Sequence, residues 1–467
     1  MGTRLVVGAL VVALLGYGVA DAMDAVPGVL TVAAPQPQPT PSPRPQPSYP
    51  PRASPGPVLP GLSREASAAT PAGVASALRP LLSSPALGPR VSASVLDAAT
   101  GEVLLDTAAG RPQVPASATK LLTAAAVLAS VGGQTRLPTR VVQGSAPDEV
   151  VLVGGGDMLL GTGRAGTGVA GRAGLADLAA QVAAQLRAEG QPRVVVRFDD
   201  SLFTGPNTAP GWSAGDVAAG YTGRVAALGL ATDRARPGHR SSLDPALTAA
   251  SAFAVALESA GVAVTGTPAR AVVPDQARVL GQVESAPVAD VLAVALAESD
   301  NALAEVLARL VARALGRPAT FEDAAMAVLD EVQQLGIDVG ATTIKDASGL
   351  SRGSLVPARV LTAVLALATG PGQQRVRPLV QGLPVAGFSG TLADRFRAAR
   401  TRGAAGLVRA KTGTLTGTGV IAGTTVDADG RLLVFAVMAD RVPPTGTLAA
   451  RGSLDRVGAA LAACGCR

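Results

Sequence analysis

Histidine, cysteine and lysine are scarce in this 467-residue sequence, and each scarcity excludes a kind of site. His239 is the single histidine, so a histidine-rich metal site is excluded and any Ser-His-Asp triad would have to use it. Its setting, Arg-Pro-Gly-His-Arg, is typical of a surface loop. Cys464 and Cys466 stand too close together to join distant parts of a fold, so we expect no disulfide framework.

Aromatic residues make up only 2% of the chain, and the basic residues form no continuous run. We therefore expect no nucleic-acid binding, despite a formal net charge of +6. A mildly basic surface would equally suit an anionic cell wall or membrane. With 48% hydrophobic and 16% charged residues the chain is too apolar for intrinsic disorder, and its length favours two globular domains.

The first 69 residues are unlike the rest of the chain. Residues 1–22 carry Arg4, then an apolar run, then Ala-Asp-Ala, which predicts a signal peptide or an uncleaved membrane anchor. Residues 23–69 form a linker whose proline-rich part, 34–60, favours an extended spacer. We therefore expect an extracytoplasmic protein of the cell envelope, secreted or anchored through its N-terminus.

Beyond Thr70 the periodicity predicts an α+β protein. Strands are predicted near both ends of this part, at 91–107 and 407–439, so we expect one antiparallel sheet of mixed origin with helices on its faces. Helical periodicity at 288–315, 321–335 and 356–368 predicts an all-helical region. Short Val-rich and Gly-rich segments predict a smaller inserted accessory domain at 138–283, within a catalytic domain formed by 70–137 and 284–467.

Only Lys120, Lys345 and Lys411 are lysines among 40 basic residues. Arginine cannot be deprotonated to act as a base, so a retained lysine suggests a role that arginine cannot fill. Ser117-Ala-Thr-Lys120 places a hydroxyl at the predicted start of a buried helix and an amine three residues later on the same face. Burial and a second cation would lower the pKa of Lys120 and make it a base for Ser117. Alternatively, Ser117 caps a helix and Lys120 is a surface charge.

Ser299-Asp300-Asn301 interrupts the apolar helical run at 288–315, where three short polar residues disfavour a helix. Ser299 and Asn301 could relay a proton to a leaving group and orient Lys120, while Asp300 points elsewhere. The alternative is an ordinary loop between two helices.

Lys411-Thr412-Gly413, followed by Thr414, lies on a predicted strand where the glycine lets another backbone approach. Lys411 could attract a substrate carboxylate, and the amide of Thr414 could join that of Ser117 in stabilising an oxyanion. A strand with an outward lysine is the competing interpretation.

Taken in order, S-x-x-K, S-x-N and K-T-G resemble the signature of penicillin-binding proteins and serine β-lactamases. The first two motifs are separated by 299 − 117 = 182 residues, which is longer than class A β-lactamases tend to have. The spacing is similar to that of the low-molecular-mass class C penicillin-binding proteins, the D-Ala-D-Ala carboxypeptidase/endopeptidase family. Segments 346–352, 383–392 and 409–415 also resemble that family, and the likeness spans roughly residues 74–460.

The resemblance implies a penicillin-binding, serine β-lactamase-like transpeptidase fold and an acyl-enzyme mechanism. Ser117 would attack the D-Ala-D-Ala bond of a peptidoglycan stem peptide, with Lys120 as the general base. Ser299 and Asn301 would complete the proton path. The family is acylated by β-lactams and needs no metal or organic cofactor.

The same resemblance implies how the substrate is held. Lys411 and Thr412 would bind its terminal carboxylate, beside Gly413 and Thr414. Arg352 would contact the side-chain carboxylate of a diaminopimelate residue.

Three other functions remain open from the sequence. A β-lactamase would share Ser117 and Lys120 but commonly needs a glutamate for deacylation, and neither Glu298 nor Glu305 has the expected context. A noncatalytic wall-binding scaffold would not need all three motifs. A Ser-His-Asp esterase would depend on His239.

Overall fold

The structure is a computed structural model that describes residues 2–23, 25–26, 30, 66–274, 276–443 and 445–467. They belong to two units, Met1–Gly61 and Leu62–Arg467. In the first unit, helix α1 (Gly2–Ala22) covers the predicted signal peptide or anchor. No helix among the described residues combines the length and apolar character of a membrane span. The expected spacer at 34–60 lies outside the described residues.

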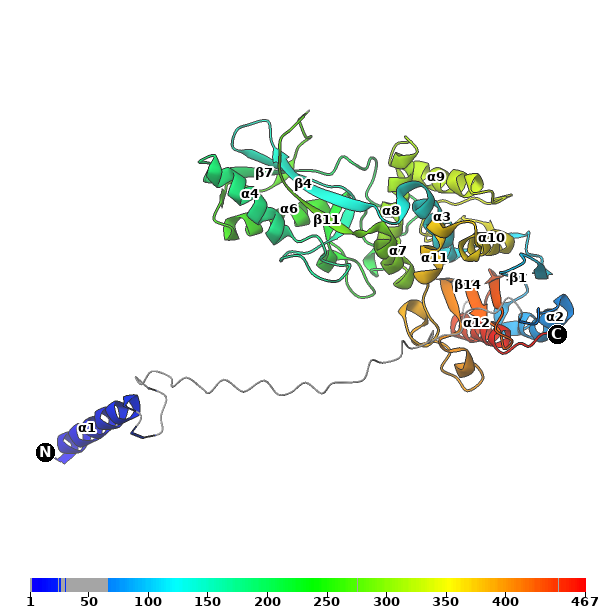
Figure 1. The fold of residues 1–467 in the computed structure, drawn as a ribbon, viewed down its shortest axis with the longest axis horizontal. Helices are drawn as coiled ribbons and strands as arrows, with labels where there is room; N and C mark the ends of the chain where they lie inside the picture. Colours follow the sequence, from blue (N-terminus) through cyan, green and yellow to red (C-terminus); the bar gives the residue numbers. More distant parts are fainter. Residues whose placement is uncertain (1, 24, 27–29, 31–65, 275, 444) are drawn as a thin grey trace, which may run out of the picture. The chain divides into compact units, whose positions relative to one another are not determined.

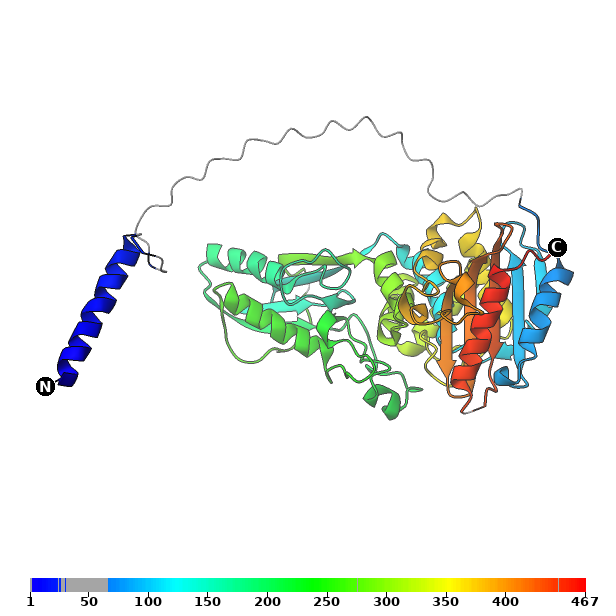
Figure 2. The same ribbon diagram turned by 90° about the horizontal axis from the view of Figure 1, so that it is seen from below.

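A five-stranded antiparallel sheet organises the second unit, in the order β13-β14-β15-β1-β2 (Figure 2). Val91 on the first strand lies opposite Ala439 on the last, so segments from opposite ends of the unit pair directly. This confirms the expected sheet of mixed origin. The bounds are β1 (Val91–Asp97), β2 (Val103–Thr107), β13 (Arg409–Leu415), β14 (Thr418–Val426) and β15 (Leu432–Ala439).

Helices cover both faces of this sheet. Helices α2 (Pro71–Leu82) and α12 (Thr447–Ala462) lie on one face, where they pack against Phe435, and α10 (Ala358–Thr369) lies on the other, against Ala436. Successive residues of a strand point to opposite faces, so a strand covered on both sides must be apolar throughout. This accounts for the unbroken Leu-Leu-Val-Phe-Ala-Val-Met-Ala run of β15.

A helical region adjoins the sheet and confirms the predicted periodicity, with one correction. The helix expected from Ser117 begins three residues later, because Ala116–Thr119 form a 3₁₀ turn that the left-handed backbone of Ala116 (φ 47°) introduces. The other helices of the region end where the sequence turns polar or reaches glycine. Their bounds are α3 (Lys120–Ala126), continuing as a π-helical turn (Val127–Gly132), α7 (Val288–Ala297), α8 (Asn301–Ala314), α9 (Phe321–Gln334) and α11 (Pro378–Gln381).

A second, mixed sheet is built from segments between 136 and 287, in the order β10-β7-β5-β4-β11, with β9 pairing β7. Two helices accompany it (Figure 1). The expected domain limits at 138 and 283 stay a prediction. The bounds are β4 (Arg136–Gln143), β5 (Glu149–Val153), α4 (Leu175–Ala188), β7 (Arg193–Asp199), α6 (Pro245–Ser259), β9 (Ala263–Val264), β10 (Ala269–Arg270) and β11 (Val279–Pro287).

Shorter elements complete the fold. They are β3 (Pro112–Gln113) paired with β12 (Val356–Pro357), β6 (Asp157–Leu160) paired with β8 (Leu228–Leu230), and helix α5 (Ala214–Ala218).

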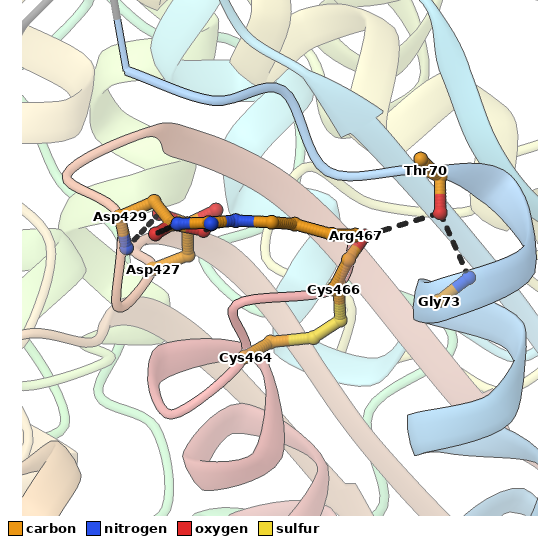
Figure 3. The surroundings of a disulfide bond; sticks show 7 residues. All are labelled: Thr70, Gly73, Asp427, Asp429, Cys464, Cys466 and Arg467. Carbon is orange, nitrogen blue, oxygen red and sulfur yellow. Dashed lines mark hydrogen bonds and ion pairs between the residues drawn. A yellow bond between two sulfur atoms is a disulfide. The ribbon is translucent and has the colours of Figure 1, made fainter.

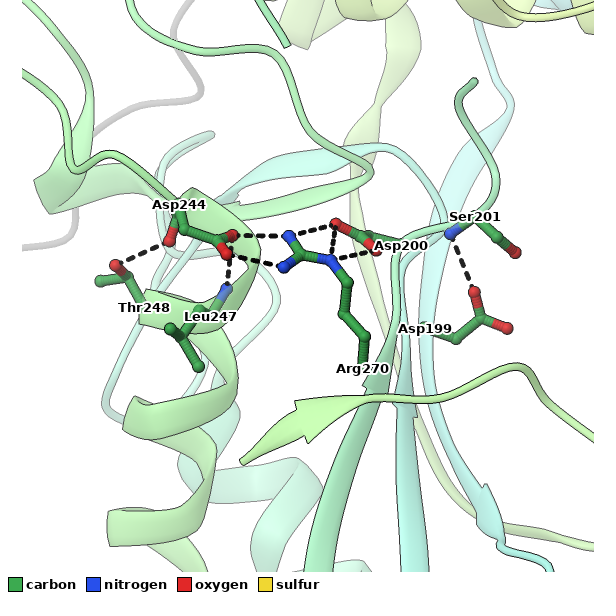
Figure 4. A network of polar contacts seen from close by, with 7 residues as sticks. All are labelled: Asp199, Asp200, Ser201, Asp244, Leu247, Thr248 and Arg270. Carbon is green, nitrogen blue, oxygen red and sulfur yellow. Dashed lines mark hydrogen bonds and ion pairs between the residues drawn. The ribbon is translucent and has the colours of Figure 1, made fainter. Parts of the chain in front are cut away.

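Arg270 links parts of the second sheet and its helix. Figure 4 shows its guanidinium between Asp200, which follows β7, and Asp244, which caps α6 through the amide of Leu247. Each carboxylate accepts hydrogen bonds from the guanidinium, and the side chain of Arg270 is 54% exposed. The arginine thus keeps its charge beside two anions at the surface.

The two cysteines form a disulfide that closes only a two-residue step, as their spacing predicts (Figure 3). The peptide beside it makes the longer connection. The carbonyl of Cys466 accepts hydrogen bonds from the amide (2.6 Å) and hydroxyl (3.1 Å) of Thr70, which also caps α2 through the amide of Gly73. A side chain at Gly73 would collide with that carbonyl. The start of α2 is therefore fixed to the C-terminal segment.

Candidate active site

The nine residues singled out in the sequence gather at one cleft of about 560 Å³. Five of them line the cleft: Ser117, Ser299, Asn301, Arg352 and Thr414. The other four lie next to these residues, in the buried walls: Lys120, Lys411, Thr412 and Gly413. Elements far apart in the sequence thus meet at the edge of the five-stranded sheet.

The 3₁₀ turn at Ala116–Thr119 brings Ser117 and Lys120 together. Side chains three residues apart eclipse each other in a 3₁₀ helix, so the serine stands directly over the lysine. The distance from Lys120 Nζ to Ser117 Oγ is 3.2 Å, and the lysine side chain is 1% exposed. A 3₁₀ turn, and not the α-helical turn that the motif predicted, therefore places the Ser117 hydroxyl within hydrogen-bonding distance of the Lys120 amine.

Lys120 has two further partners, both acceptors. Its Nζ donates to Asn301 Oδ1 at 2.6 Å and to the carbonyl of Ser348 at 2.8 Å. A neutral amine has two N–H bonds and one lone pair. With both N–H bonds held by these acceptors, the lone pair is left to face the hydroxyl of Ser117.

The surroundings of Lys120 favour that neutral amine. Burial lowers its pKa to about 8, although the nearby carboxylates of Asp346 and Asp300 act to raise it. Lys411 is also fully buried, and burial together with the charge of Lys120 places its pKa well below the ordinary value. The lysine expected to be a base therefore gives up its proton near neutral pH.

Ser299-Asp300-Asn301 occupies the break between α7 and α8. Ser299 has a left-handed backbone (φ 57°), a conformation that costs energy for a non-glycine residue and turns its hydroxyl towards the cleft. Asp300 caps α8 by accepting from the amide of Leu303 and forms an ion pair with Arg234. Asp300 therefore has a structural part as a helix cap, although it also lines the cleft and does not point wholly away from it.

The side-chain amide of Asn301 is held at both ends. Its Nδ2 donates to the carbonyl of Tyr221 at 2.8 Å, so its Oδ1 must face Lys120. Tyr221 comes from the segment between β7 and β8. This contact could not be predicted from the sequence, because any residue at position 221 has a carbonyl.

Lys411 connects β13 with the break between α7 and α8. Its Nζ donates to Ser299 Oγ and to the carbonyl of Thr412, both at 2.9 Å. The hydroxyl of Thr412 donates in turn to Thr391, a contact that the sequence analysis missed. Gly413 is required because a Cβ there would lie 2.6 Å from the carbonyl of Pro115. β13 is the outer strand of its sheet, and the start of its outer edge pairs with residues 384–385. Thr414, further along the strand, lines the cleft.

Charged residues surround the mouth of the cleft. Arg352 is exposed there, as are parts of Arg234 and Arg236, with Asp216 and Glu298 among them. The mouth therefore offers both cationic and anionic partners to a substrate that carries both charges.

The alternative mechanisms lack comparable geometry. His239 is exposed and does not line the cleft, so it is not placed to activate Ser117. Glu298 forms an ion pair with Arg234, and Glu305 is buried behind Lys120. Ser117 and Lys120 are thus the hydroxyl and the amine that the structure places within hydrogen-bonding distance of each other at the cleft.

Comparisons with known proteins point to one family. The model of the D-Ala-D-Ala carboxypeptidase 3 (S13) family matches residues 74–239 and 232–461. The chain is 39% identical over 432 residues to Carboxypeptidase DacB of Mycolicibacterium smegmatis, covering 90% of this chain and 91% of that protein. It is 38% identical over 411 residues to Carboxypeptidase Rv3627c of Mycobacterium tuberculosis, covering 85% and 86%. It is 30% identical over 443 residues to a D-alanyl-D-alanine carboxypeptidase of Actinomadura sp. (strain R39), covering 75% and 78%.

Solved structures share the fold. The crystal structure of penicillin binding protein 4 (dacB) from Haemophilus influenzae matches with a TM-score of 0.67 at 21% identity, over 82% of this chain and 97% of that one. Another structure of that protein, complexed with a novel β-lactam, matches with a TM-score of 0.59 at 20% identity, over 82% and 98%. The α+β architecture is thus that of a penicillin-binding protein.

Proposed function

Because this chain belongs to the D-Ala-D-Ala carboxypeptidase 3 (S13) family, we propose that Ser117 is the nucleophile with which it cleaves peptidoglycan stem peptides. The chain is a serine-type D-Ala-D-Ala carboxypeptidase and therefore a hydrolase. The observation that carries the assignment to Ser117 is the amine of Lys120, which is buried, held by two acceptors and 3.2 Å from the serine hydroxyl.

Acylation begins when Lys120 takes the proton of the Ser117 hydroxyl. The serine oxygen forms a bond to the carbonyl carbon of the penultimate D-Ala, and the resulting oxyanion is stabilised by the backbone amides of Ser117 and Thr414. This arrangement is supported by the position of both residues in the wall of the cleft.

Departure of the terminal D-Ala requires a proton on its amine. Ser299 supplies that proton from its hydroxyl and recovers one from Lys411, whose Nζ donates to its Oγ at 2.9 Å. The C–N bond breaks, and the acyl group remains on Ser117. Water then attacks the ester, returns the hydroxyl to Ser117 and releases the shortened peptide.

The edge of β13 holds the substrate in this proposal. An extended peptide adds beside an outer strand through main-chain hydrogen bonds. Lys411 and Thr412 provide positive charge and a hydroxyl near the terminal carboxylate, with Gly413 and Thr414 lining the strand. Arg352 at the mouth binds the side-chain carboxylate of diaminopimelate.

β-Lactams are proposed as covalent inhibitors of the same serine. The lactam carbonyl would take the place of the D-Ala carbonyl, and opening of the ring leaves an ester on Ser117. The likeness in fold to a penicillin-binding protein solved with a β-lactam supports this proposal.

We place the protein outside the cytoplasm, in the cell envelope. Its substrate is there, and its disulfide fits an oxidising compartment. The segment containing α1 acts either as a cleaved signal peptide or as a tether to the membrane. Mass spectrometry of the mature N-terminus distinguishes the two, because cleavage after Ala22 removes the whole helix.

The first experiment uses residues 62–467, which form the second compact unit. A fluorescent penicillin and a stem pentapeptide are given to this protein and to Ser117→Ala. We expect durable labelling and release of D-Ala, both lost in the variant. Rapid turnover of the penicillin would instead favour a β-lactamase, and a protein that is not labelled at all would favour a scaffold.

A further inference from the structure

Glu305 is a buried carboxyl group that the proposed mechanism does not use. It lies on α8, one turn after Asn301, and its side chain is fully buried. Its Oε1 accepts a hydrogen bond from the amide of Ser348 at 2.7 Å. Its Oε2 has no hydrogen-bond partner among the described residues. A group that is buried at the cost of an unpaired oxygen calls for an explanation beyond packing.

The Ser348 peptide connects Glu305 with the active site. Its amide donates to Glu305 at 2.7 Å and, at the longer distance of 3.1 Å, to Asp346. Its carbonyl accepts from Lys120 Nζ at 2.8 Å. This carbonyl is one of the two acceptors that fix the N–H bonds of the neutral amine. The position of the Ser348 peptide therefore decides whether the lone pair of Lys120 points at Ser117.

Asp346, on the same loop as Ser348, has a different environment. Its two oxygens accept hydrogen bonds from three backbone amides, from the hydroxyl of Ser348 and from the indole of Trp212. These donors stabilise a charged carboxylate. Among the described residues, only the amide and the nearby hydroxyl of Ser348 donate towards Glu305, so the cluster holds one anion and one carboxyl group that has less support for a charge.

We propose that Glu305 is a positioning residue for the general base, acting in its uncharged form through Ser348. Its carbonyl oxygen fixes the Ser348 amide, and the Ser348 carbonyl then orients the amine of Lys120 towards Ser117. The inference rests on the proposed roles of Ser117 and Lys120.

The uncharged state matters as much as the hydrogen bond. Burial raises the pKa of Glu305 well above its ordinary value, and the charge of Asp346 raises it further. The other charged groups around Glu305 and the base are Asp300, Lys411 and, on its own helix, Arg309. A neutral Glu305 does not add its charge to those of Asp346 and Asp300, which favour the proton on Lys120. The amine can then act as a base near neutral pH.

Two substitutions of Glu305 separate the effect of its hydrogen-bond acceptor from the effect of a charge on its side chain. Glu305→Gln keeps an oxygen that accepts from Ser348 and cannot ionise, whereas Glu305→Leu removes the acceptor. Glu331→Leu is the matched control, because Glu331 is also a buried glutamate on a helix of this region, while the hydrogen bond from the Ser348 amide goes to Glu305. All three are made in the full chain, and thermal unfolding is recorded for each.

Acylation by a fluorescent penicillin is measured from pH 6 to 10, with the rate of the covalent step separated from binding. We expect Glu305→Leu to slow the covalent step by about tenfold to a hundredfold with little change in binding, because a small misplacement of a catalytic group has that effect. Glu305→Gln should recover most of the rate and keep the pH at half-maximal rate. The inference is overturned if Gln is as slow as Leu, or if Leu reacts like the wild type.

A second measurement does not depend on catalysis. Hydrogen–deuterium exchange of residues 345–351 should become faster in Glu305→Leu, stay slow in Glu305→Gln and be unaffected in Glu331→Leu. Unchanged exchange in Glu305→Leu would refute the contact with Ser348. A wild-type protein that is not acylated would refute the proposed function, while the exchange data still test the positioning of Ser348.

Discussion

Basic side chains have opposite environments in the cleft and in the second sheet. In the cleft, Lys120 and Lys411 are buried and form no ion pair among the described residues, and burial lowers both pKa values. In the second sheet, Arg270 is half exposed between two aspartates, and its hydrogen bonds with Asp200 and Asp244 raise its pKa. The chain thus has arginine where a charge is kept at the surface and, at position 120, a lysine where the proposed mechanism requires a proton to leave. Lys345, the third lysine, is exposed outside the cleft.

The largest effect is expected when Lys120, the proposed base, is replaced by arginine. Lys120→Arg should slow acylation by about a thousandfold or more, because a guanidinium stays protonated and cannot accept the proton of Ser117. Covalent labelling followed by intact mass spectrometry measures it. Lys345→Arg is the control and should react like the wild type. A Lys120→Arg protein that kept a tenth of the rate would contradict the role of the lysine as base.

Asn301→Asp would place a carboxylate beside the buried Lys120, just as aspartates lie beside Arg270. A carboxylate 2.6 Å from Nζ would raise the pKa of Lys120 and, near pH 7, should slow acylation by about a hundredfold. Part of the loss should be recovered at higher pH, where the amine is again neutral. A pH–rate profile beside that of Asn301→Ala separates the effect of the charge from loss of the amide. Equal profiles for the two variants would argue against an electrostatic cause.

The unmodified enzyme should itself report the pKa of the base. Lys120 must be neutral to react, so acylation should rise with pH, with a midpoint near the pKa of about 8, and fall about tenfold per unit below it. Stopped-flow acylation between pH 5.5 and 9.5 tests the sign and the midpoint. A rate that fell on raising the pH through this range would require a protonated lysine instead.

The smallest effect is expected from the surface arginine. Arg270→Met should lower the free energy of unfolding by about 1 kcal/mol or less, because exposed ion pairs contribute little, and should leave acylation unchanged. The pKa of Asp244 is held below its ordinary value of 3.8, so the contribution of the pair is present above that pH and is lost as the pH falls through the folded pKa. Urea unfolding at pH 7 and pH 3 measures both. A large loss of activity would couple this network to the cleft.

Much of the fold was predictable from the sequence because its signals are local. The apolar runs of β1 and β15, the helical periodicity of α9 and the break at Ser299 each follow from neighbouring residues. The 3₁₀ turn at Ser117 was not predictable, since it depends on the backbone conformation of Ala116.

The parts of the candidate site formed by side chains could be predicted from the sequence. The parts formed by backbone groups could not. The motifs identified Ser117 and the residues around it, together with Lys120 and Lys411, as candidate site residues. The carbonyls of Tyr221 and Ser348 that orient Asn301 and Lys120 have no signature, because every residue has one. Glu305 stands in the sequence among ordinary helical residues, and only the packed structure shows that it is buried behind Lys120.

Because β1 pairs with β15, the five-stranded sheet can form only after nearly the whole chain has been synthesised. Synthesis starts at the N-terminus, so β1 and β2 can pair only with each other until β15 has been synthesised. A two-stranded hairpin is only marginally stable by itself. Contacts between such distant segments make folding slow, more than they weaken the finished protein. The edge strand that carries Lys411 joins β1 only through β14 and β15. A nascent chain that stops before Leu432 therefore has every side chain proposed for catalysis but lacks the strand that joins β14 to β1, and reactivity towards a penicillin becomes a test of complete assembly.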